Sequence, residues 1–218
     1  ALSAGEVSAL FNYESTPRFS PLNDSNFVSA IDLWFDAEAN ATAIYGHIND
    51  WNVSDVTNMS FAFLNRTSFN EDISNWNTSS VTRLYRTFWG ATSFTGDGVS
   101  NWDTSSVTTM FQTFSAATSF SGHGVINWDT SRVRNMEATF HGTTSFNADL
   151  SNWDTSSVTD MYAMFYNATS FNGRIGNWDT AKVTDMSWMF GYASSFDQDL
   201  NEWATSAVTE MSNMFGSA

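Results

Sequence analysis

The sequence has no cysteine, only two prolines and a single lysine among its 218 residues. Without cysteine, a disulfide framework, a thiolate zinc site and a cysteine nucleophile are all excluded. Charged residues make up 14% of the chain, compared with about 25% in an average domain. They are mostly acidic, with 23 Asp and Glu against 8 Lys and Arg, which gives a net charge of −15. Because phosphate contacts need basic side chains, we expect neither nucleic acid nor an anionic membrane surface as a partner.

Long apolar runs are also missing, so we expect no transmembrane segment. The chain begins with Ala1 where an initiator methionine would stand, and we expect it to have been processed or trimmed. What the chain has in excess is aromatic side chains: 19 Phe, 10 Trp and 6 Tyr. The interior is therefore expected to be built mainly from rings.

A repeat of 25 or 26 residues organises the sequence from about residue 44 onward. The repeat tryptophans are Trp51, Trp76, Trp102, Trp128, Trp153, Trp178 and Trp203. We number positions from this tryptophan, so that +5 lies five residues after it. Valine recurs at +5, Met or Leu at +8, Phe at +12 and +18, and a branched aliphatic residue at −3. A unit of this size cannot bury its own apolar face, so the repeat predicts stacked coils that share one core.

The spacing within each copy predicts its secondary structure. Positions +5, +8 and +12 are three and four residues apart, which is typical of one face of an α-helix. Residues such as Asp154 to Ser157 favour a helix start, and Gly90, Gly142 and Asn167 favour its end. The following segment, as in 145–153, is predicted to be a short strand. The predicted fold class is α/β: a right-handed, leucine-rich-repeat-like solenoid of about seven coils, each a helix plus a short strand, with an N-terminal helical cap.

We predict two parts, an N-terminal capping segment over residues 1–43 and the repeat solenoid over residues 44–218. Within the first, Asn26 to Asp36 is predicted to be an amphipathic helix that is started by Ser25 and covers the first coil. The sequence stops at Ala218 inside a seventh copy, with no polar cap after it. We therefore expect either that this end was cut or that the chain self-associates through its uncapped C-terminal coil.

The unit SFNADLSNWDTSSVTDMYAMF, from Ser145 to Phe165, resembles the surface-protein repeat called domain of unknown function 285. That family is grouped with the BspA-like leucine-rich repeats, and the resemblance covers roughly residues 44–218. It implies an extracellular or cell-surface solenoid used in adhesion or binding, and it implies no catalytic residues. The chain departs from the pattern at Arg132 and Arg134, where most copies have Ser and Thr, and in two one-residue insertions.

Aromatic side chains at +9 and +13, and one position further on in the sixth copy, are the leading candidates for a ligand-binding surface. They share a predicted helix face, and exposed rings favour sugars and protein partners. The candidates, with the neighbouring histidine, are Tyr85, Trp89, Phe111, His141, Tyr162, Tyr166, Trp188 and Tyr192. The alternative is that these rings only fill space between coils.

Three other features have both a functional and a structural interpretation, and for each we favour the structural one. The insertions Gly96 to Gly98 and Gly122 to Gly124 could bring Asp97 and His123 together around a divalent ion, or form paired bulges without a ligand. The Asp column at +1 could attract cations or only cap turns. The Thr columns at +2 and +16 could order water for ice binding or only bond the backbone.

Acceptor sequences for N-glycosylation begin at Asn23, Asn40, Asn52, Asn58, Asn65, Asn77 and Asn167. No catalytic motif is found, so we expect no enzyme activity, cofactor or bound metal. We expect a non-enzymatic binding or adhesion protein outside the cell or at its surface, with a protein or carbohydrate ligand held by the variable positions +7, +9, +10 and +13. A structural subunit of an extracellular filament, coat or wall is the alternative, and ice binding is a weaker one.

Overall fold

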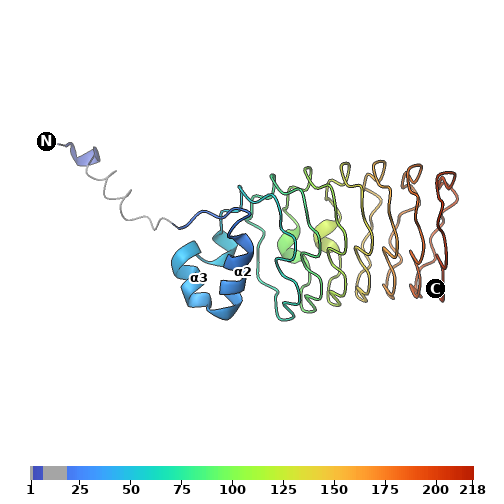
Figure 1. Cartoon of the computed structure of the whole chain (residues 1–218), viewed down its shortest axis with the longest axis horizontal. Helices are drawn as coiled ribbons and strands as arrows, with labels where there is room; N and C mark the ends of the chain where they lie inside the picture. Colours follow the sequence, from blue (N-terminus) through green and yellow to red (C-terminus); the bar gives the residue numbers. More distant parts are fainter. Residues whose placement is uncertain (1, 7–18) are drawn as a thin grey trace.

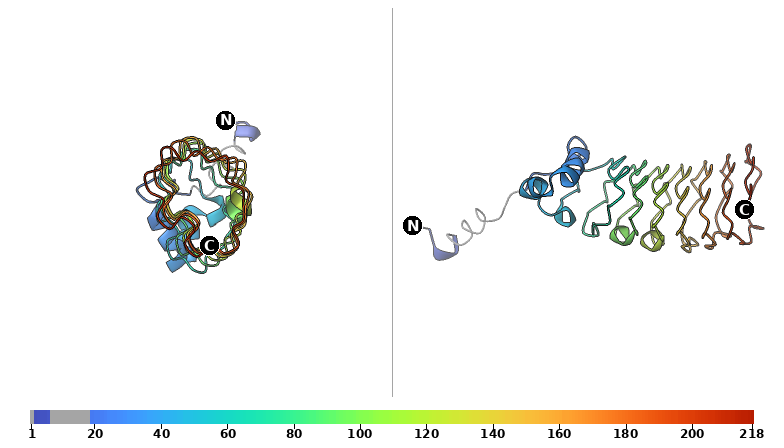
Figure 2. Two further views of the ribbon diagram at one scale, coloured as in Figure 1. Left: turned by 90° about the vertical axis from the view of Figure 1, so that its right-hand side faces the viewer. Right: turned by 90° about the horizontal axis from the view of Figure 1, so that it is seen from below.

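The computed structural model describes residues 2–6 and 19–218 of the chain. The coils of the repeat lie side by side along the long axis, and helices α2 and α3 lie at their N-terminal end (Figure 1). Seen along this axis, successive coils superimpose, so equivalent positions of neighbouring coils lie next to each other (Figure 2). Residue 1 and residues 7–18 of the predicted capping segment lie outside the described part.

Helix α2 spans Phe27–Asp36 and helix α3 spans Glu38–Tyr45. The first confirms the predicted amphipathic helix, since its buried residues are Phe27, Ala30, Ile31 and Trp34. The predicted start at Ser25 is wrong. Asn26 is the N-cap residue, and the Ser25 hydroxyl instead donates to the Asn23 side-chain oxygen at 2.6 Å.

Helix α2 packs on the aromatic core of the first coils. Its Phe27 ring meets Trp76 edge-on at 5.6 Å, and its Trp34 ring meets Trp51 edge-on at 6.0 Å. The open end of the ring stack is therefore covered by apolar side chains of the helix rather than by solvent.

The predicted α/β, right-handed, leucine-rich-repeat-like solenoid of helix-plus-strand coils is wrong. Residues 46–218 contain neither an α-helix nor a β-strand, and their regular elements are three short 3-10 turns. These are η1 (Ile48–Asp50), η2 (Asp97–Val99) and η3 (His123–Val125). Neighbouring coils are joined at +7 by isolated parallel bridges, from Asn58 with Arg83 to Asp185 with Glu210.

Overlapping turns occupy the stretch that was predicted to be helical. The N–H groups at +11, +13 and +15 donate to the carbonyl three residues earlier, as from Ala62 to Met59 at 3.2 Å. The N–H groups at +8, +10, +12 and +14 donate instead to the next coil, as from Phe63 to Thr87 at 2.8 Å. Every second peptide group therefore points along the stack, whereas an α-helix needs each N–H to bond within its own segment.

Two residues in each coil adopt left-handed φ values, at +10 and +14. At +14 the sequence supplies residue types that tolerate this conformation, such as Gly90 (φ 69°), Gly142 (φ 68°) and Asn167 (φ 55°). They are recurrent turn residues and not the helix ends that we predicted. At +10 no copy has glycine, and φ lies between 49° and 66° for Phe61, Arg86, Gln112, Ala138, Ala163, Trp188 and Asn213.

The repeat tryptophans form a buried stack along the rod. Adjacent rings are nearly parallel, with centroids 6.1 Å apart between Trp76 and Trp102 and between Trp102 and Trp128. Each indole from the second copy onward also donates to the −3 carbonyl of the preceding coil, as from Trp128 to Val99 at 3.1 Å. The phenylalanines at +12 and +18 stack beside them, with Phe88 and Phe94 at 4.3 Å. The indoles thus provide both packing and a hydrogen bond between coils.

The two insertions form the stacked turns η2 and η3. Gly96 and Gly122, with φ of 97° and 91°, begin them. Gly124 lies so close to the preceding turn that an added Cβ atom would stand 2.1 Å from the Gly96 carbonyl oxygen. Glycine at this position is therefore required by the close approach of two backbones.

We predict that Trp128→Phe lowers the free energy of unfolding by about 1–3 kcal/mol, because phenylalanine is smaller than indole and loses the N–H that donates to the buried Val99 carbonyl, which then keeps only the Trp102 N–H. Urea unfolding measures the change. Trp89→Phe, at a half-buried indole on the surface, is the control and should change stability by less than about 0.5 kcal/mol. Equal stability of Trp128→Phe and the wild type would show that the indole hydrogen bond does not stabilise the fold.

We predict that Gly124→Ala lowers the free energy of unfolding by about 3 kcal/mol, because its Cβ meets backbone that cannot rotate away. Gly142→Ala is the matched control, since a Cβ there would have 3.8 Å of clearance and Ala116 already occupies the equivalent position. It should cost only about 1 kcal/mol, from its left-handed backbone. Thermal unfolding of both variants compares the two costs, and equal costs would contradict the proposed close packing.

Candidate functional site

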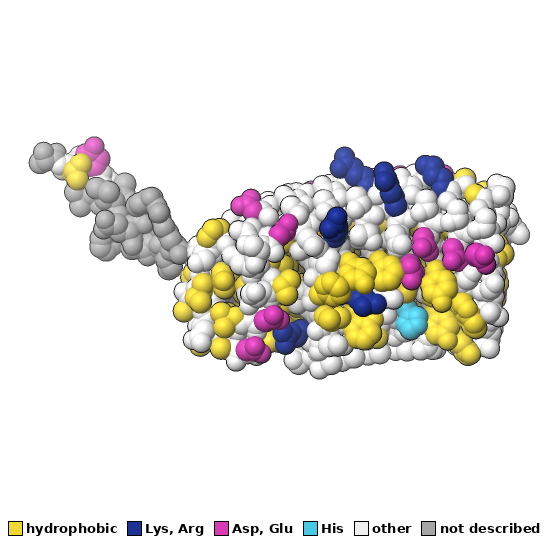
Figure 3. All heavy atoms as spheres, in the orientation of Figure 1, with side chains coloured by type: hydrophobic (Ala, Val, Ile, Leu, Met, Phe, Trp, Pro, Cys, Tyr) yellow, Lys and Arg dark blue, Asp and Glu magenta, His cyan; other side chains and the backbone are white. Residues whose placement is uncertain are grey.

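Apolar side chains gather in two groups on one face of the stack, with acidic side chains and a histidine beside them (Figure 3). The upstream aromatic group consists of Phe61, Tyr85 and Phe111. Phe61 meets Tyr85 edge-on at 4.8 Å, and Tyr85 stacks on Phe111 at 5.0 Å. The guanidinium carbon of Arg86 lies 5.3 Å from the Tyr85 ring centre, and its Nε donates to Gln112 Oε1 at 2.6 Å. A cation of the chain itself therefore lies over these rings.

The downstream aromatic group consists of His141, Tyr162, Tyr166, Trp188 and Tyr192. His141 stacks on Tyr166 at 4.9 Å, and Tyr166 meets Trp188 and Tyr192 at steep angles, at 5.8 and 5.3 Å. Tyr162 and Tyr192 remain 38% and 44% exposed. These rings present free faces to solvent.

The downstream group walls a hollow of about 320 Å³, which is also lined by Gln112, Ala138 and Ala163. The two alanines are buried and form its floor. Both occupy +10, where the other copies carry Phe61, Arg86, Gln112, Trp188 and Asn213. The hollow exists because two adjacent coils have a small residue at this position.

Three carboxylates, here called the acidic row, lie beside the downstream group: Glu137, Asp160 and Asp185. Asp160 Oδ1 accepts the Tyr162 N–H at 2.9 Å, and Asp185 Oδ1 accepts the Ser187 N–H at 2.7 Å. Burial raises the pKa of Glu137, and the charges of Asp160 and Asp185 raise it further, while Arg86 opposes them. Burial and the charge of Asp185 likewise raise the pKa of Asp160, against its hydrogen bond from Tyr162. The row is thus a place where negative charges repel one another.

The predicted ligand-binding residues divide between the two groups. His141, Tyr162, Tyr166 and Trp188 line the hollow. Tyr192 packs on its wall, Tyr85 and Phe111 belong to the upstream group, and Trp89 is half-buried. The helix face that was predicted to align them is absent, and their contacts run from coil to coil. At +10 the sequence analysis named Trp188, but it missed Gln112, Ala138 and Ala163, although it marked that position as variable.

The polar columns serve the scaffold. At +2, the buried Thr130 hydroxyl donates to the Asp154 carbonyl of the next coil at 2.9 Å, and most copies repeat this bond. At +1, Asp103 accepts the Ser105 N–H at 3.0 Å and its hydroxyl at 2.7 Å, and these bonds lower the pKa of Asp103. The +2 hydroxyls are therefore unavailable to an ice surface, and the +1 carboxylates bond within their own turns.

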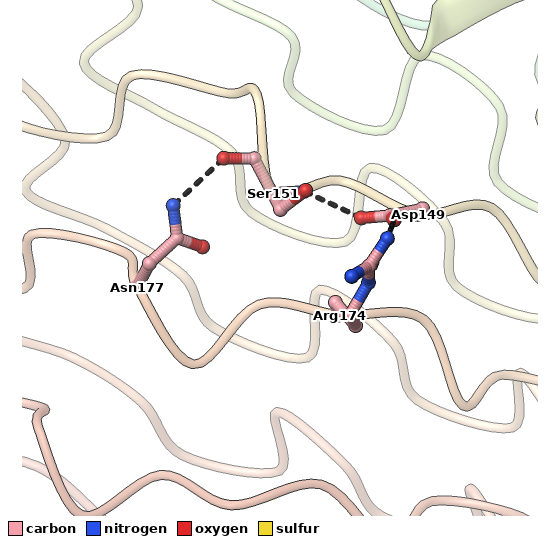
Figure 4. Close-up of polar contacts among 4 residues, drawn as sticks. All are labelled: Asp149, Ser151, Arg174 and Asn177. Atoms are coloured by element: carbon pink, nitrogen blue, oxygen red, sulfur yellow. Dashed lines mark hydrogen bonds and ion pairs between the residues drawn. The ribbon is translucent and has the colours of Figure 1, made fainter.

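Polar contacts also join coils at −4 and −1 (Figure 4). Asn177 Nδ2 donates to the Ser151 carbonyl at 2.7 Å, the Ser151 N–H donates to Asp149 Oδ1 at 3.0 Å, and Arg174 of the next coil pairs with Asp149. The Asn177 and Arg174 contacts join two coils, whereas the Ser151 bond lies within one turn.

Asp97 and His123 of the insertions each contact a hydroxyl of their own coil. Asp97 accepts the Thr95 hydroxyl at 3.2 Å, and the His123 ring contacts the Ser121 hydroxyl at 3.3 Å. Across residues 2–6 and 19–218, no group of three or more His, Cys, Asp or Glu side chains could hold a metal ion. The same residues include no helix that is long and apolar enough to cross a membrane. Of the asparagines in acceptor sequences, Asn58 is half-buried and the others are exposed.

We predict that Glu137→Gln raises the melting temperature at pH 7, because it removes a carboxylate whose pKa is raised in the folded state. Such a group binds its proton more tightly when folded, so its ionisation destabilises the fold as pH rises above its ordinary value. The gain should therefore vanish near pH 4, where Glu137 is protonated. Asp154→Asn is the control, since hydrogen bonds from Ser156 lower the pKa of Asp154, and it should not stabilise. Calorimetry at both pH values distinguishes them, and a gain that does not depend on pH would contradict the charge explanation.

The comparisons with known proteins identify a family without a known function. The family model described as "Mycoplasma protein of unknown function, DUF285" matches residues 31–124 and again residues 121–218. No curated protein and no solved structure matches the chain. The two family matches together span the whole repeat and the end of helix α2. The chain is therefore a repeat protein that belongs to the DUF285 family.

Proposed function

We propose that this chain is a non-enzymatic binding or adhesion protein and that the hollow of the downstream aromatic group is its ligand-binding site. The observation that carries the proposal is the set of part-exposed rings around an alanine floor. Concave sites lined by aromatic side chains with a few polar groups are the usual form of binding sites. Here His141 and Gln112 supply the polar groups.

The scaffold supports this role because it holds the rings in place. Trp188, Tyr166 and Tyr162 project from three turns whose backbones are hydrogen-bonded to neighbouring coils, as from Ala163 to Ser187 at 2.9 Å. A surface whose side chains are already ordered loses little conformational entropy when a ligand binds. Positions +7, +9, +10 and +13 can change between copies without disturbing the buried columns.

We extend the proposal to a location outside the cell or at its surface, in keeping with the resemblance of the repeat to BspA-like surface proteins. A protein or a carbohydrate would be the ligand. Tyrosine and tryptophan faces suit both, because they combine a large apolar area with few rotatable bonds.

Arrays of glycans and of secreted and cell-surface proteins test the proposal. Trp188→Ala and Tyr166→Ala should each lower the affinity for a binding partner by at least about tenfold, which corresponds to about 1.4 kcal/mol of binding free energy. Phe61→Ala is the matched control for Trp188→Ala, because both residues occupy +10 with left-handed φ. Alanine already occurs there in two copies, so both variants should fold. A partner that binds all three variants and the wild type equally would exclude the hollow.

A further inference from the structure

The chain itself shows how it holds a guanidinium group. The guanidinium carbon of Arg66 lies 4.6 Å from the centre of the Phe35 ring, and its Nη2 pairs with Asp32 Oδ1 at 2.6 Å. The arrangement combines a ring face with a carboxylate, and both attract the cation. Arg86 uses the same ring chemistry over Tyr85 and Phe111 in the upstream group.

The downstream group has the rings and the carboxylates but no arginine over them. Among residues 19–218, the cation–π pairs involve Phe35, Tyr85 and Phe111, and none involves a ring of the downstream group. The position of Arg86 in its coil, +10, is taken by Ala138 and Ala163 in the coils that form the hollow. The hollow therefore lies where a long side chain at +10 would otherwise extend.

We propose that the hollow and the acidic row together bind a basic segment of another polypeptide, with an arginine side chain entering between the rings and the carboxylates. This inference rests on the proposed function of the same site and specifies the partner. The arginine would stack on Tyr166 or Trp188 as Arg86 stacks on Tyr85. The N–H groups of its guanidinium would face the carboxylates of Asp160 and Asp185.

Charge complementarity favours a basic segment over a neutral sugar. The acidic row continues along the stack at +7, where Asp160, Asp185 and Glu210 are joined by successive parallel bridges. Bridged positions recur about every 4.8 Å, so an extended chain with several basic side chains can meet more than one carboxylate. The net charge of −15 also steers a basic partner toward the protein.

The mutual repulsion within the acidic row gives a further physical reason for cation binding. The carboxylates of Glu137 and Asp160 are held close to other acids, and Arg86 is the basic group that faces Glu137. A bound guanidinium would reduce their mutual repulsion. Binding should therefore weaken at acidic pH, as these carboxylates take up protons.

Isothermal titration with a capped Gly-Arg-Gly-Arg-Gly-Arg-Gly peptide tests the inference, with the citrulline version as an uncharged control of the same shape. Asp160→Asn/Asp185→Asn should weaken binding by about tenfold. Asp103→Asn/Asp129→Asn is the matched variant, because it removes the same charge from carboxylates that also accept backbone N–H groups of turns. It should change affinity by less than about twofold at 150 mM salt. Equal weakening by the two double variants, or binding of the citrulline peptide, would overturn the inference.

Ala163→Arg provides an independent test because it adds the side chain that Arg86 supplies upstream. We expect this variant to keep the melting temperature of the wild type. Its affinity for the peptide should fall by at least about tenfold, since its own guanidinium occupies the hollow. Unchanged peptide affinity in a folded Ala163→Arg variant would also overturn the inference.

The two proposals can fail separately. In one outcome, a neutral glycan or protein loses binding to Trp188→Ala while its binding to Asp160→Asn/Asp185→Asn stays unchanged. That result would support the hollow as a binding site and exclude the basic partner. A peptide that binds Trp188→Ala as well as it binds the wild type would exclude the hollow and the inference together.

Discussion

Hydrogen bonds that cross from coil to coil are the constraint on which the rest of the structure depends. Four N–H groups in each of the first six copies, at +8, +10, +12 and +14, find their acceptors in the following coil, and each indole from the second copy onward finds its acceptor in the preceding one. A single coil would leave these groups unpaired, at a cost that its small core could not offset. Each coil is therefore stable only beside its neighbours. The distance between coils that these bonds impose also sets the distance between the stacked rings.

The same constraint creates the face that carries the candidate site. Because alternate peptide groups point along the stack, side chains at +9 and +13 meet their equivalents in adjacent coils, as Tyr85 meets Phe111 and His141 meets Tyr166. Surface features can then be changed one position at a time. Arg86 covers the upstream rings, whereas Ala138 and Ala163 leave the downstream rings open.

Charge also varies along the rod at a fixed position. The bridged +7 column passes from Arg83 through Thr109 and Asn135 to Asp160 and Asp185. The buried columns beneath it stay the same along the described stack, so the polarity of the surface changes without any change in the core.

The sequence by itself determined the period, the buried columns and helix α2, since all three depend on which side chains avoid water. It did not determine the backbone of the coils. Apolar residues three and four apart fit a helix as well as they fit this ladder of turns, and Gly90 or Asn167 could end either one. Only the tertiary structure decided the conformation, because the acceptors of alternate N–H groups lie 24 or 25 residues away in the next coil. The hollow was decided in the same way, since the neighbours of Tyr166 and Trp188 depend on how the coils stack.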